Sequence, residues 1–389
     1  MKKILFVSNF YSSYISAGTS QRTRDIKKGL INMGWDCKVV TIKRKKLPKY
    51  KEPDNKDIVA LETFNEKYPL PHISIFKLYD LIKNSSVVHI IDHWSVLNIL
   101  SVFFCFLSKT PYVYSPCGAI KPIGRNIFIE KLYNFIFLDF IIKNSSYIFA
   151  ITKNEFNEIK KLSKNKLNIR VVPNGIWKSK KFNPQNTIQI QSKFKNINIA
   201  KKFILYVGRL SYVKGPDILF DAFLEMKLRK DYSLIFAGPD DNMQNKILNK
   251  YKNINKQKNI VFLGPLTAIE RDYFMQKATL VVIPSRKEAM SMVALESSIV
   301  GTPFLATNSC GLDDFIKNSA GFICKANSKS LSNKLNYILN DYKTIKTIGI
   351  NAKKYVTKNY SWEFILKKIN LYLNELHINK SKLKNRKNK

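Results

Sequence analysis

The segment Gly208–Gly215, which reads Gly-Arg-Leu-Ser-Tyr-Val-Lys-Gly, combines two glycines with two cations. It follows the apolar run Phe203–Val207, a predicted strand, and precedes Pro216, which suits the first turn of a helix. Glycine at a strand end lets the backbone approach a ligand closely. Arg209 suits bidentate phosphate contact, and Lys214 adds a point charge. The segment predicts a phosphate site, with a solvated basic loop as the alternative, and it matches neither a Walker loop nor a Rossmann glycine motif.

A second candidate site begins at Glu288 and continues to Glu296, in a chain with only 28 acidic residues. The pattern predicts a helix from Ser291 to Val300, because Gly301 supplies a C-terminal stop signal. The free N–H groups at its start, at about Ala289 to Met292, favour an anion. The alternative for Glu296 is a capped or salt-bridged position on the helix surface.

Together these two segments resemble the motifs of glycosyltransferase family 4, the retaining nucleotide-sugar enzymes of GT-B fold. Glu288 and Glu296 match the family's E-x7-E motif, and Gly208–Gly215 matches its G-R-L-x-x-x-K-G loop. Pro173-Asn174-Gly175 is similar to the segment that closes the first domain, and Ser361-Trp362 to the start of the last helix. The resemblance therefore spans nearly the whole chain.

The resemblance implies a role for each matching residue. Arg209 and Lys214 are implied to hold the donor pyrophosphate, and Glu296 to hydrogen-bond the ribose hydroxyls. Glu288 is implied to act at the catalytic centre by holding the transferred sugar. Further donor contacts are implied where the chain matches the glycine turn, the strand end beside the nucleobase and the helix start: Gly18, Gly264, Ala289, Met290, Ser291 and Met292.

The chain departs from the family pattern at three places. Ala289 and Ser291 replace the glycines of the common E-G-F-G form, so we expect a narrower sugar pocket. Val213 stands where a glutamate often precedes the loop lysine, and Thr19 stands where a second glycine often follows Gly18.

The segment Tyr114–Ala119 resembles S-P-x-G of capsule and lipopolysaccharide enzymes, where x is commonly basic. Here x is Cys117, so Cys117 and Gly118 are predicted to contact the acceptor, and the basic group is missing or comes from elsewhere. His93 is the nearest candidate and is predicted as a second catalytic residue. The alternatives are that His93 is a loop histidine packed near Trp94, and that Cys117 is a small buried hydrophobe.

Short apolar runs alternate with helical patterns along the chain, which predicts an α/β protein with parallel sheets covered on both faces. We expect GT-B architecture, with two doubly wound Rossmann-like domains facing a central cleft. The expected parts are residues 1–176 for acceptor binding, a linker at 177–202, residues 203–358 for donor binding, a helix at 359–378 that crosses back to the first domain, and a disordered basic tail at 379–389.

The composition indicates polyanionic partners, because 66 basic and 28 acidic residues give a formal net charge of +38. The expected partners are a nucleotide-sugar donor (UDP-sugar by default, GDP-sugar as an option), a glycan or polyprenyl-diphosphate-linked acceptor, and an anionic membrane surface. Aromatic residues within Asn126–Lys143 suggest an interfacial helix, although most of them could instead be core. Scattered cysteines and no apolar run of transmembrane length favour a reduced, cytoplasmic protein, peripheral on the inner membrane face.

Neither a metal nor a cofactor is expected, because Arg209, Lys214 and helix N–H groups can stabilise the leaving diphosphate. Two other functions fit parts of the sequence. A nucleotide-sugar 2-epimerase shares the two-domain architecture. A nucleic-acid-binding protein would use the same charge, but no nucleic-acid-binding motif is present, so no nucleic-acid partner is expected.

Overall fold

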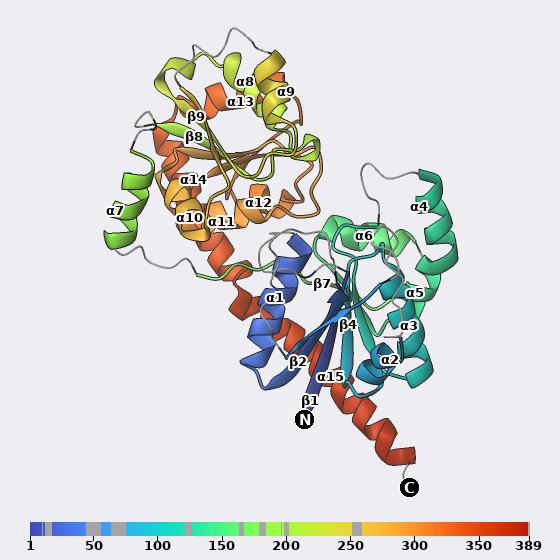
Figure 1. The fold of residues 1–389 in the computed structure, drawn as a ribbon. Coiled ribbons are helices and arrows are strands. Elements are labelled where there is room, and N and C mark those ends of the chain that lie inside the picture. The colour runs from blue at the N-terminus through green and yellow to red at the C-terminus, as the bar shows by residue number, and fades with distance from the viewer. Residues whose placement is uncertain are drawn as a thin grey trace. The chain divides into compact units, whose positions relative to one another are not determined.

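The computed structural model describes residues 1–9, 11, 18–43, 56–63, 75–120, 127–162, 167–178, 184–195, 197, 202–250 and 259–387. The chain forms two compact units. Unit 1 comprises Met1–Gly175 together with Trp362–Lys389, and unit 2 comprises Ile176–Ser361. Each unit is a parallel sheet between helices (Figure 1), so the predicted α/β class with two Rossmann-like domains is confirmed.

The sheet of unit 1 has seven strands in the order β3-β2-β1-β4-β5-β6-β7, all parallel. The strands are β1 (Lys2–Ser8), β2 (Trp35–Ile42), β3 (Ile58–Leu61), β4 (Val87–Ile91), β5 (Tyr112–Ser115), β6 (Tyr147–Ala150) and β7 (Ile169–Val171). The aliphatic and aromatic side chains of β1, β4, β5 and β6 are almost wholly buried, as expected for strands covered on both faces, whereas the edge strands β3 and β7 are partly exposed.

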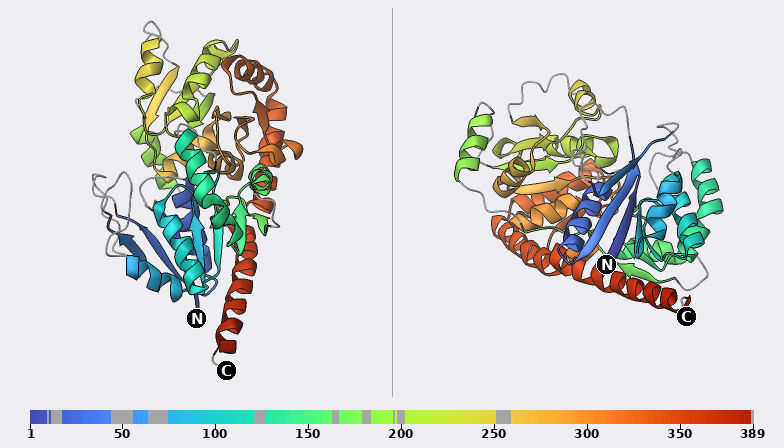
Figure 2. Two further views of the ribbon diagram at one scale, coloured as in Figure 1. Left: turned by 90° about the vertical axis from the view of Figure 1, so that its right-hand side faces the viewer. Right: turned by 60° about the horizontal axis from the view of Figure 1, so that its bottom comes forward.

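The helices of unit 1 are α1 (Gly18–Ile31), α2 (Ile75–Lys83), α3 (Val96–Ser108), α4 (Ile127–Tyr133), the π-helical turn η1 (Asn134–Leu138), α5 (Asp139–Lys143), α6 (Lys153–Lys161) and α15 (Trp362–Lys387). α1 and α15 pack against each other, on the face of the sheet away from α2 and α3 (Figure 2). Gly29 permits this contact, because a Cβ atom there would lie 2.1 Å from Cδ1 of Leu366.

The last helix is longer than the sequence predicted. The expected disordered tail at 379–389 is wrong for the described residues, since α15 continues to Lys387. Lys380 explains part of this extension: its Nζ donates hydrogen bonds to the Ser85 carbonyl (2.5 Å) and Thr110 Oγ1 (2.9 Å). The positive charge is thus held by oxygens of unit 1 rather than left in solvent.

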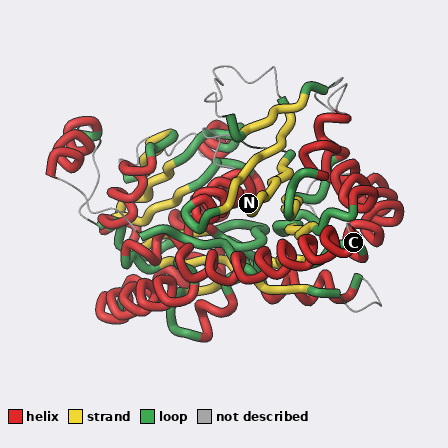
Figure 3. The backbone as a smooth tube through the Cα atoms, turned by 90° about the horizontal axis from the view of Figure 1, so that it is seen from below, coloured by secondary structure: helices red, strands yellow, loops and turns green. Residues whose placement is uncertain are grey.

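The sheet of unit 2 has six parallel strands in the order β10-β9-β8-β11-β12-β13. The strands are β8 (Phe203–Val207), β9 (Ser233–Ala237), β10 (Ile260–Gly264), β11 (Leu280–Ile283), β12 (Phe304–Thr307) and β13 (Phe322–Cys324). The α-helices are α7 (Pro184–Lys193), α8 (Pro216–Leu224), α9 (Gln244–Lys250), α10 (Ala268–Lys277), α11 (Met292–Val300), α12 (Asp313–Lys317), α13 (Ser328–Leu339) and α14 (Tyr342–Asn359), with 3-10 turns η2 (Tyr212–Lys214) and η3 (Arg229–Asp231). Figure 3 shows the strands and the helices that flank them.

The predicted linker at 177–202 is not irregular throughout, since α7 lies inside it. Lys193 Nζ bonds Glu270 Oε1 at 2.6 Å, and the ring of Phe194 packs edge-on against Phe274 at 5.1 Å. These contacts join the segment to unit 2. The sequence pattern did not predict α7, because few of its residues are apolar and no helical period is visible.

Candidate active site

The sheet order of unit 2 brings the two predicted motifs together. β8 lies between β9 and β11, and the helices that follow β8 and β11 lie on opposite faces of the sheet (Figure 1). Parallel strands end at the same edge, so the loop after β8 and the loop after β11 emerge side by side. In doubly wound folds, ligands bind at this point where the strand order reverses.

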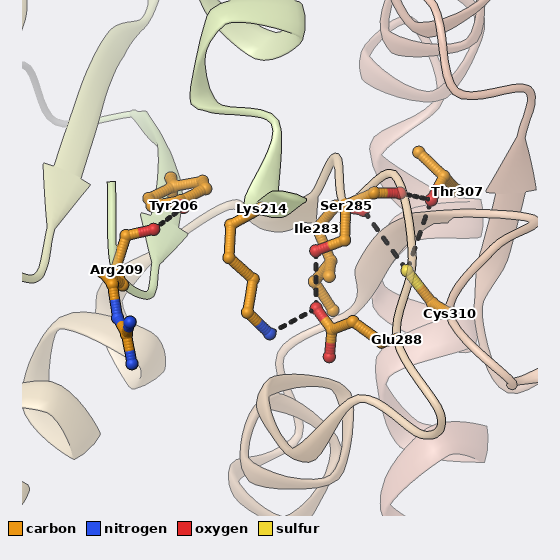
Figure 4. Close-up of polar contacts among 8 residues, drawn as sticks. All are labelled: Tyr206, Arg209, Lys214, Ile283, Ser285, Glu288, Thr307 and Cys310. Atoms are coloured by element: carbon orange, nitrogen blue, oxygen red, sulfur yellow. Dashed lines mark hydrogen bonds and ion pairs between the residues drawn. The ribbon is translucent and has the colours of Figure 1, made fainter. Parts of the chain in front are cut away.

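Lys214 and Glu288 meet at that edge. Lys214 Nζ lies 2.9 Å from Glu288 Oε1, and the Ser285 hydroxyl donates a hydrogen bond to the same oxygen (Figure 4). Glu288 is nearly buried, whereas Lys214 stays partly exposed. The pair therefore combines a fixed carboxylate with a cation that solvent, or an anionic ligand, can reach.

Thr307 and Cys310 fix the backbone at Ser285. The Thr307 hydroxyl donates to the Ser285 carbonyl, and Cys310 Sγ lies 3.3 Å from Thr307 Oγ1 (Figure 4). Burial, reinforced by the negative charge of Glu288, raises the pKa of Cys310 to about 12. The thiol therefore stays neutral and acts as a packing group near the site.

The loop Gly208–Gly215 can lie this close to β11 because it ends in glycine. Gly215 has a left-handed φ of 66°, and a Cβ atom there would lie 2.2 Å from the Pro284 carbonyl oxygen. Arg286 fastens the two loops together by donating to both carboxylate oxygens of Asp217, at 2.9 and 2.6 Å. The guanidinium also stacks on the Tyr212 ring at 3.9 Å. Nothing local in the sequence indicates the Arg286–Asp217 ion pair, because its partners are 69 residues apart.

Arg209 leaves the same loop with its side chain more than half exposed. The Tyr206 hydroxyl donates to the Arg209 carbonyl at 2.7 Å and so fixes the backbone (Figure 4). The guanidinium lies 4.0 Å from the Asp241 carboxylate, at the limit of an ion pair between two exposed groups. Arg209 is therefore held weakly and is available to a ligand.

The helix start after Glu288 differs in part from the prediction. α11 begins at Met292, one residue later than expected, and Ser291 is its N-cap. The backbone N–H of Ser291 donates to the Cys310 carbonyl at 3.1 Å, so it is not available to an anion. Ser291 is fully buried, and its hydroxyl has no hydrogen-bond partner among the described residues. Ala289 is partly exposed and Met290 is buried.

Glu296 and Gly264 lie at the next part of the edge. Arg271 Nη2 on α10 contacts Glu296 Oε1 on α11 at 3.0 Å, so the salt bridge considered from the sequence is present. Gly264 ends β10 with φ of 69°, a left-handed conformation that favours glycine. The sequence did not single out Arg271, since nothing local indicates which residue of α11 it faces.

His93 lies in unit 1, directly after β4, and is fully buried. Its Nδ1 is 2.7 Å from the Tyr114 hydroxyl, and its Nε2 is 2.8 Å from Asn134 Oδ1. The ring also packs against Trp94 and Tyr133. Because Asn134 Oδ1 only accepts, Nε2 carries the proton and Nδ1 accepts from the tyrosine. Both nitrogens are therefore engaged, as in the alternative of a packed loop histidine.

Cys117 and Gly118 follow β5 with left-handed φ values of 55° and 78°. The Gly118 N–H donates to Glu155 Oε1 at 2.5 Å. Burial raises the pKa of the Cys117 thiol to about 12, with the positive charge of Arg22 opposing this effect. The guanidinium of Arg22 is therefore a positive charge close enough to Cys117 to act on its thiol.

Arg22 is itself closely held. It is buried, and it donates to the Val172 carbonyl (2.8 Å), the Pro173 carbonyl (2.8 Å) and Asn174 Oδ1 (3.0 Å). Gly18, by contrast, is the exposed first residue of α1, and no described atom lies within 4 Å of a Cβ placed there. The structure places Gly18, His93, Cys117 and Gly118 in unit 1, and the remaining candidate residues in unit 2.

Two features are absent from the described residues. No group of three or more His, Cys, Asp or Glu side chains among them is arranged to hold a metal ion. No helix within the described part of the chain is long and apolar enough to span a membrane.

Comparison with known proteins shows the class of enzyme to which the chain is similar. Residues 187–355, which include Arg209, Lys214, Glu288 and Glu296, match the family model described as Glycosyl transferases group 1. The chain is 24% identical to an uncharacterized glycosyltransferase of Methanocaldococcus jannaschii, over 95% of this chain and 97% of that protein. The chain is an enzyme of the glycosyltransferase class.

Two further comparisons bear on this glycosyltransferase. It is 31% identical to a lipopolysaccharide 1,2-N-acetylglucosaminetransferase of Salmonella typhimurium, over 50% of this chain and 53% of that protein. The crystal structure of Anabaena HepE with UDP and glucose superimposes with a TM-score of 0.79 at 17% identity, over 96% of this chain and 100% of that one. The expected GT-B architecture is thereby confirmed at the level of the fold.

Proposed function

We propose that the protein is a retaining glycosyltransferase of family 4 that transfers a sugar from a nucleotide-diphosphate sugar to a glycan acceptor. The observation that carries this proposal is the 2.9 Å contact between Lys214 and Glu288 at the strand-order reversal of unit 2, within the matched region 187–355. A cation faces solvent there beside a buried carboxylate.

The proposed mechanism assigns opposite charges to these groups. Cleaving the sugar–phosphate bond develops negative charge on the diphosphate, which Lys214 and Arg209 stabilise from fixed positions. Glu288 holds the transferred sugar. The acceptor hydroxyl attacks from the face that the diphosphate leaves, and the leaving phosphate takes its proton. No step needs a metal ion, so turnover abolished by EDTA and restored by magnesium would contradict this mechanism.

The donor is proposed to be a UDP-sugar, with a GDP-sugar as the second candidate. Support comes from the HepE structure, which contains UDP and glucose. Thermal unfolding of the protein with UDP, GDP and ADP tests the proposal. A ligand at 100 times its Kd adds about 2.7 kcal/mol, which raises the Tm by several degrees.

The variant Arg209→Ala completes this experiment. We expect one nucleotide to raise the Tm of the wild type and to lose most of that effect in the variant. No shift with any of the three nucleotides contradicts the donor site. Product analysis without acceptor separates the rival epimerase, which would release an epimerised nucleotide-sugar.

The acceptor is proposed to be a lipid-linked glycan of bacterial surface polysaccharide synthesis, bound at the edge of unit 1 near Cys117 and Gly118. The Salmonella relative is named for lipopolysaccharide, which supports this class. The proposed location is the inner face of the cytoplasmic membrane.

The surface of unit 1 supports membrane attachment. Of the aromatic residues in the predicted helix 126–143, Phe128 and Phe135 are 80% and 87% exposed, whereas Phe137 and Phe140 pack on the core. The membrane face is the set of exposed apolar residues on α2, α3, α4 and η1: Phe76, Phe103, Phe106, Leu107, Phe128, Leu132, Phe135 and Ile136. Exposed Lys77, Lys109 and Lys131 lie on or beside the same helices and favour anionic lipid.

Sedimentation with phosphatidylglycerol vesicles at low salt tests this attachment. We expect the wild type to bind and the double variant Phe128→Ser, Phe135→Ser to remain in solution. Tyr337→Ser with Tyr342→Ser is the matched control, because each tyrosine is 68% exposed but lies in unit 2. Wild type that stays in the supernatant would refute membrane attachment while leaving the donor site intact.

A further inference from the structure

Glu296, the carboxylate for which the family resemblance implies a ribose contact, is held by a side chain from a neighbouring helix. Arg271 Nη2 lies 3.0 Å from Glu296 Oε1. The side chains are 30% and 15% exposed, so the pair is partly shielded from water, unlike the exposed pairs that contribute little. A charge-assisted hydrogen bond in such a place fixes both partners.

The position of Arg271 is itself fixed by the start of α10. Thr267 caps this helix, and Glu270 completes a capping box. The Arg271 N–H donates to the Thr267 carbonyl at 2.9 Å. Lys193 holds Glu270 from the side of α7 at 2.6 Å. The guanidinium of Arg271 therefore extends toward α11 from the capped first turn of α10, the helix that follows Gly264.

The guanidinium of Arg271 is not fully used. Its Nε is buried and has no hydrogen-bond partner among the described residues. Arginine often holds a carboxylate through two parallel N–H···O bonds, and Nε of Arg271 does not form the second of them here. The contact through Nη2 orients Glu296 through one of its oxygens, Oε1.

We propose that Arg271 is a positioning residue that orients Glu296 to accept hydrogen bonds from the ribose hydroxyls of the donor. The inference rests on the proposed donor site. A carboxylate accepts two O–H donors only when its oxygens face the diol, and a free glutamate side chain would lose rotamer entropy on binding. Arg271 removes that freedom before the nucleotide arrives.

Calorimetric titration of two nucleotides tests the proposal. UDP carries both ribose hydroxyls, and 2′,3′-dideoxy-UDP carries neither, so the ratio of their affinities measures the ribose contact. The corresponding guanosine pair replaces them if the thermal screen selects GDP. We expect Glu296→Ala and Arg271→Ala each to weaken UDP binding roughly tenfold or more. Neither change should alter binding of the dideoxy nucleotide.

Three further variants separate positioning from a structural role. The double variant Arg271→Ala, Glu296→Ala should bind UDP about as tightly as the single variant with the lower affinity. The two losses should not add, because both substitutions remove the same ribose contact. Arg271→Lys should recover part of the lost affinity. Lys250→Ala is the matched control, since it removes a different ion pair of unit 2, with Asp221, and should leave the affinity ratio unchanged. In turnover, Arg271→Ala should raise the donor KM with little change in kcat.

The outcomes are distinct. Equal weakening of both nucleotides by Arg271→Ala, or unchanged UDP binding, overturns the positioning role. Wild type that binds UDP no better than its dideoxy analogue overturns this inference and leaves the donor site standing. Wild type that binds neither UDP nor GDP overturns the proposed donor site and the inference with it.

Discussion

The carboxyl edges of the two sheets hold their arginines in opposite ways. In unit 2, the Arg209 side chain is 56% exposed and leaves a loop whose backbone is fixed by glycine and tyrosine contacts. In unit 1, Arg22 is 2% exposed and donates to three oxygens of residues 172–174. The two edges share a strand topology. In unit 2 the arginine is exposed to a ligand, whereas in unit 1 the arginine joins buried backbone segments through hydrogen bonds.

This difference has a physical reading. An exposed cation that has only weak partners loses little hydration when an anion replaces water. A buried cation can stay charged only if the protein supplies its hydrogen bonds. Burial lowers the pKa of Arg22, while Cys117 and Glu155 nearby oppose that shift. We therefore expect removal of the Arg209 charge to weaken ligand binding by unit 2. Removal of the Arg22 charge should instead lower the folding stability of unit 1.

The largest expected effect is on the stability of unit 1. Arg22→Met should lower its free energy of unfolding by about 3–5 kcal/mol, because Glu155 is left buried without its nearby cation. Arg209→Met, the matched change in unit 2, should alter stability by less than about 0.5 kcal/mol. Urea denaturation followed by circular dichroism measures both. Equal losses in the two variants would show that the comparison between the edges is mistaken.

The next effect is on catalysis in unit 2. Lys214→Ala should lower kcat/KM for the donor by about 10²–10³, the usual loss when one group that stabilises developing charge is removed. Its Tm should fall less than that of Arg22→Met, because the nearly buried Glu288 loses a partner but Lys214 itself is partly exposed. Lys250→Ala is the control, since Lys250 also pairs with an acid at 2.9 Å in unit 2. A similar loss of activity in both variants would argue against a specific role for Lys214.

The smallest effect is a pH dependence confined to unit 1. Burial lowers the pKa of His89 to about 3, with the charge of Arg22 adding to the effect. The unfolded chain takes up a proton near pH 6.5 and the folded chain does not, so stability falls as the pH falls below 6.5. Between pH 6.5 and 5 the loss should be roughly 1.5 kcal/mol.

His89→Gln isolates this contribution. The variant should show a flatter dependence of unfolding free energy on pH than the wild type. All four histidines of the chain precede Gly175 or follow Trp362, so unit 2 contains none and should lack the effect. An unchanged pH dependence in the variant would mean that another group causes it.

Much of the fold follows from local sequence. Continuous apolar runs such as Phe203–Val207 become buried strands because both sheet faces are covered. The contact between Lys214 and Glu288 also follows from the strand arrangement. Parallel strands end at one edge of the sheet, and the two motifs follow the neighbouring strands β8 and β11. The sequence pattern therefore predicted the strands and the residues that lie at their carboxyl ends.

The parts that were missed depend on how helices face each other. Nothing near Arg271 indicates that it meets Glu296, and nothing near Cys310 indicates that its carbonyl accepts the Ser291 N–H. Phe128 and Phe137 are alike in type, yet one faces solvent and the other the core. Nine residues along a helix place these two side chains on opposite faces, but the sequence does not say which face meets the core.

The helix α15 has a consequence for how the chain is made. Its side chains complete unit 1, as when Glu375 accepts a hydrogen bond from the Tyr147 hydroxyl and Asn370 from Trp35 Nε1. Unit 1 is otherwise finished at Gly175, and 186 residues separate it from Trp362. At translation rates of about 5–20 residues per second, roughly 10 to 40 seconds pass before α15 begins to emerge. During that interval the nascent unit 1 exposes the apolar surface around Gly29 and Trp35 on the ribosome, where a chaperone can bind it.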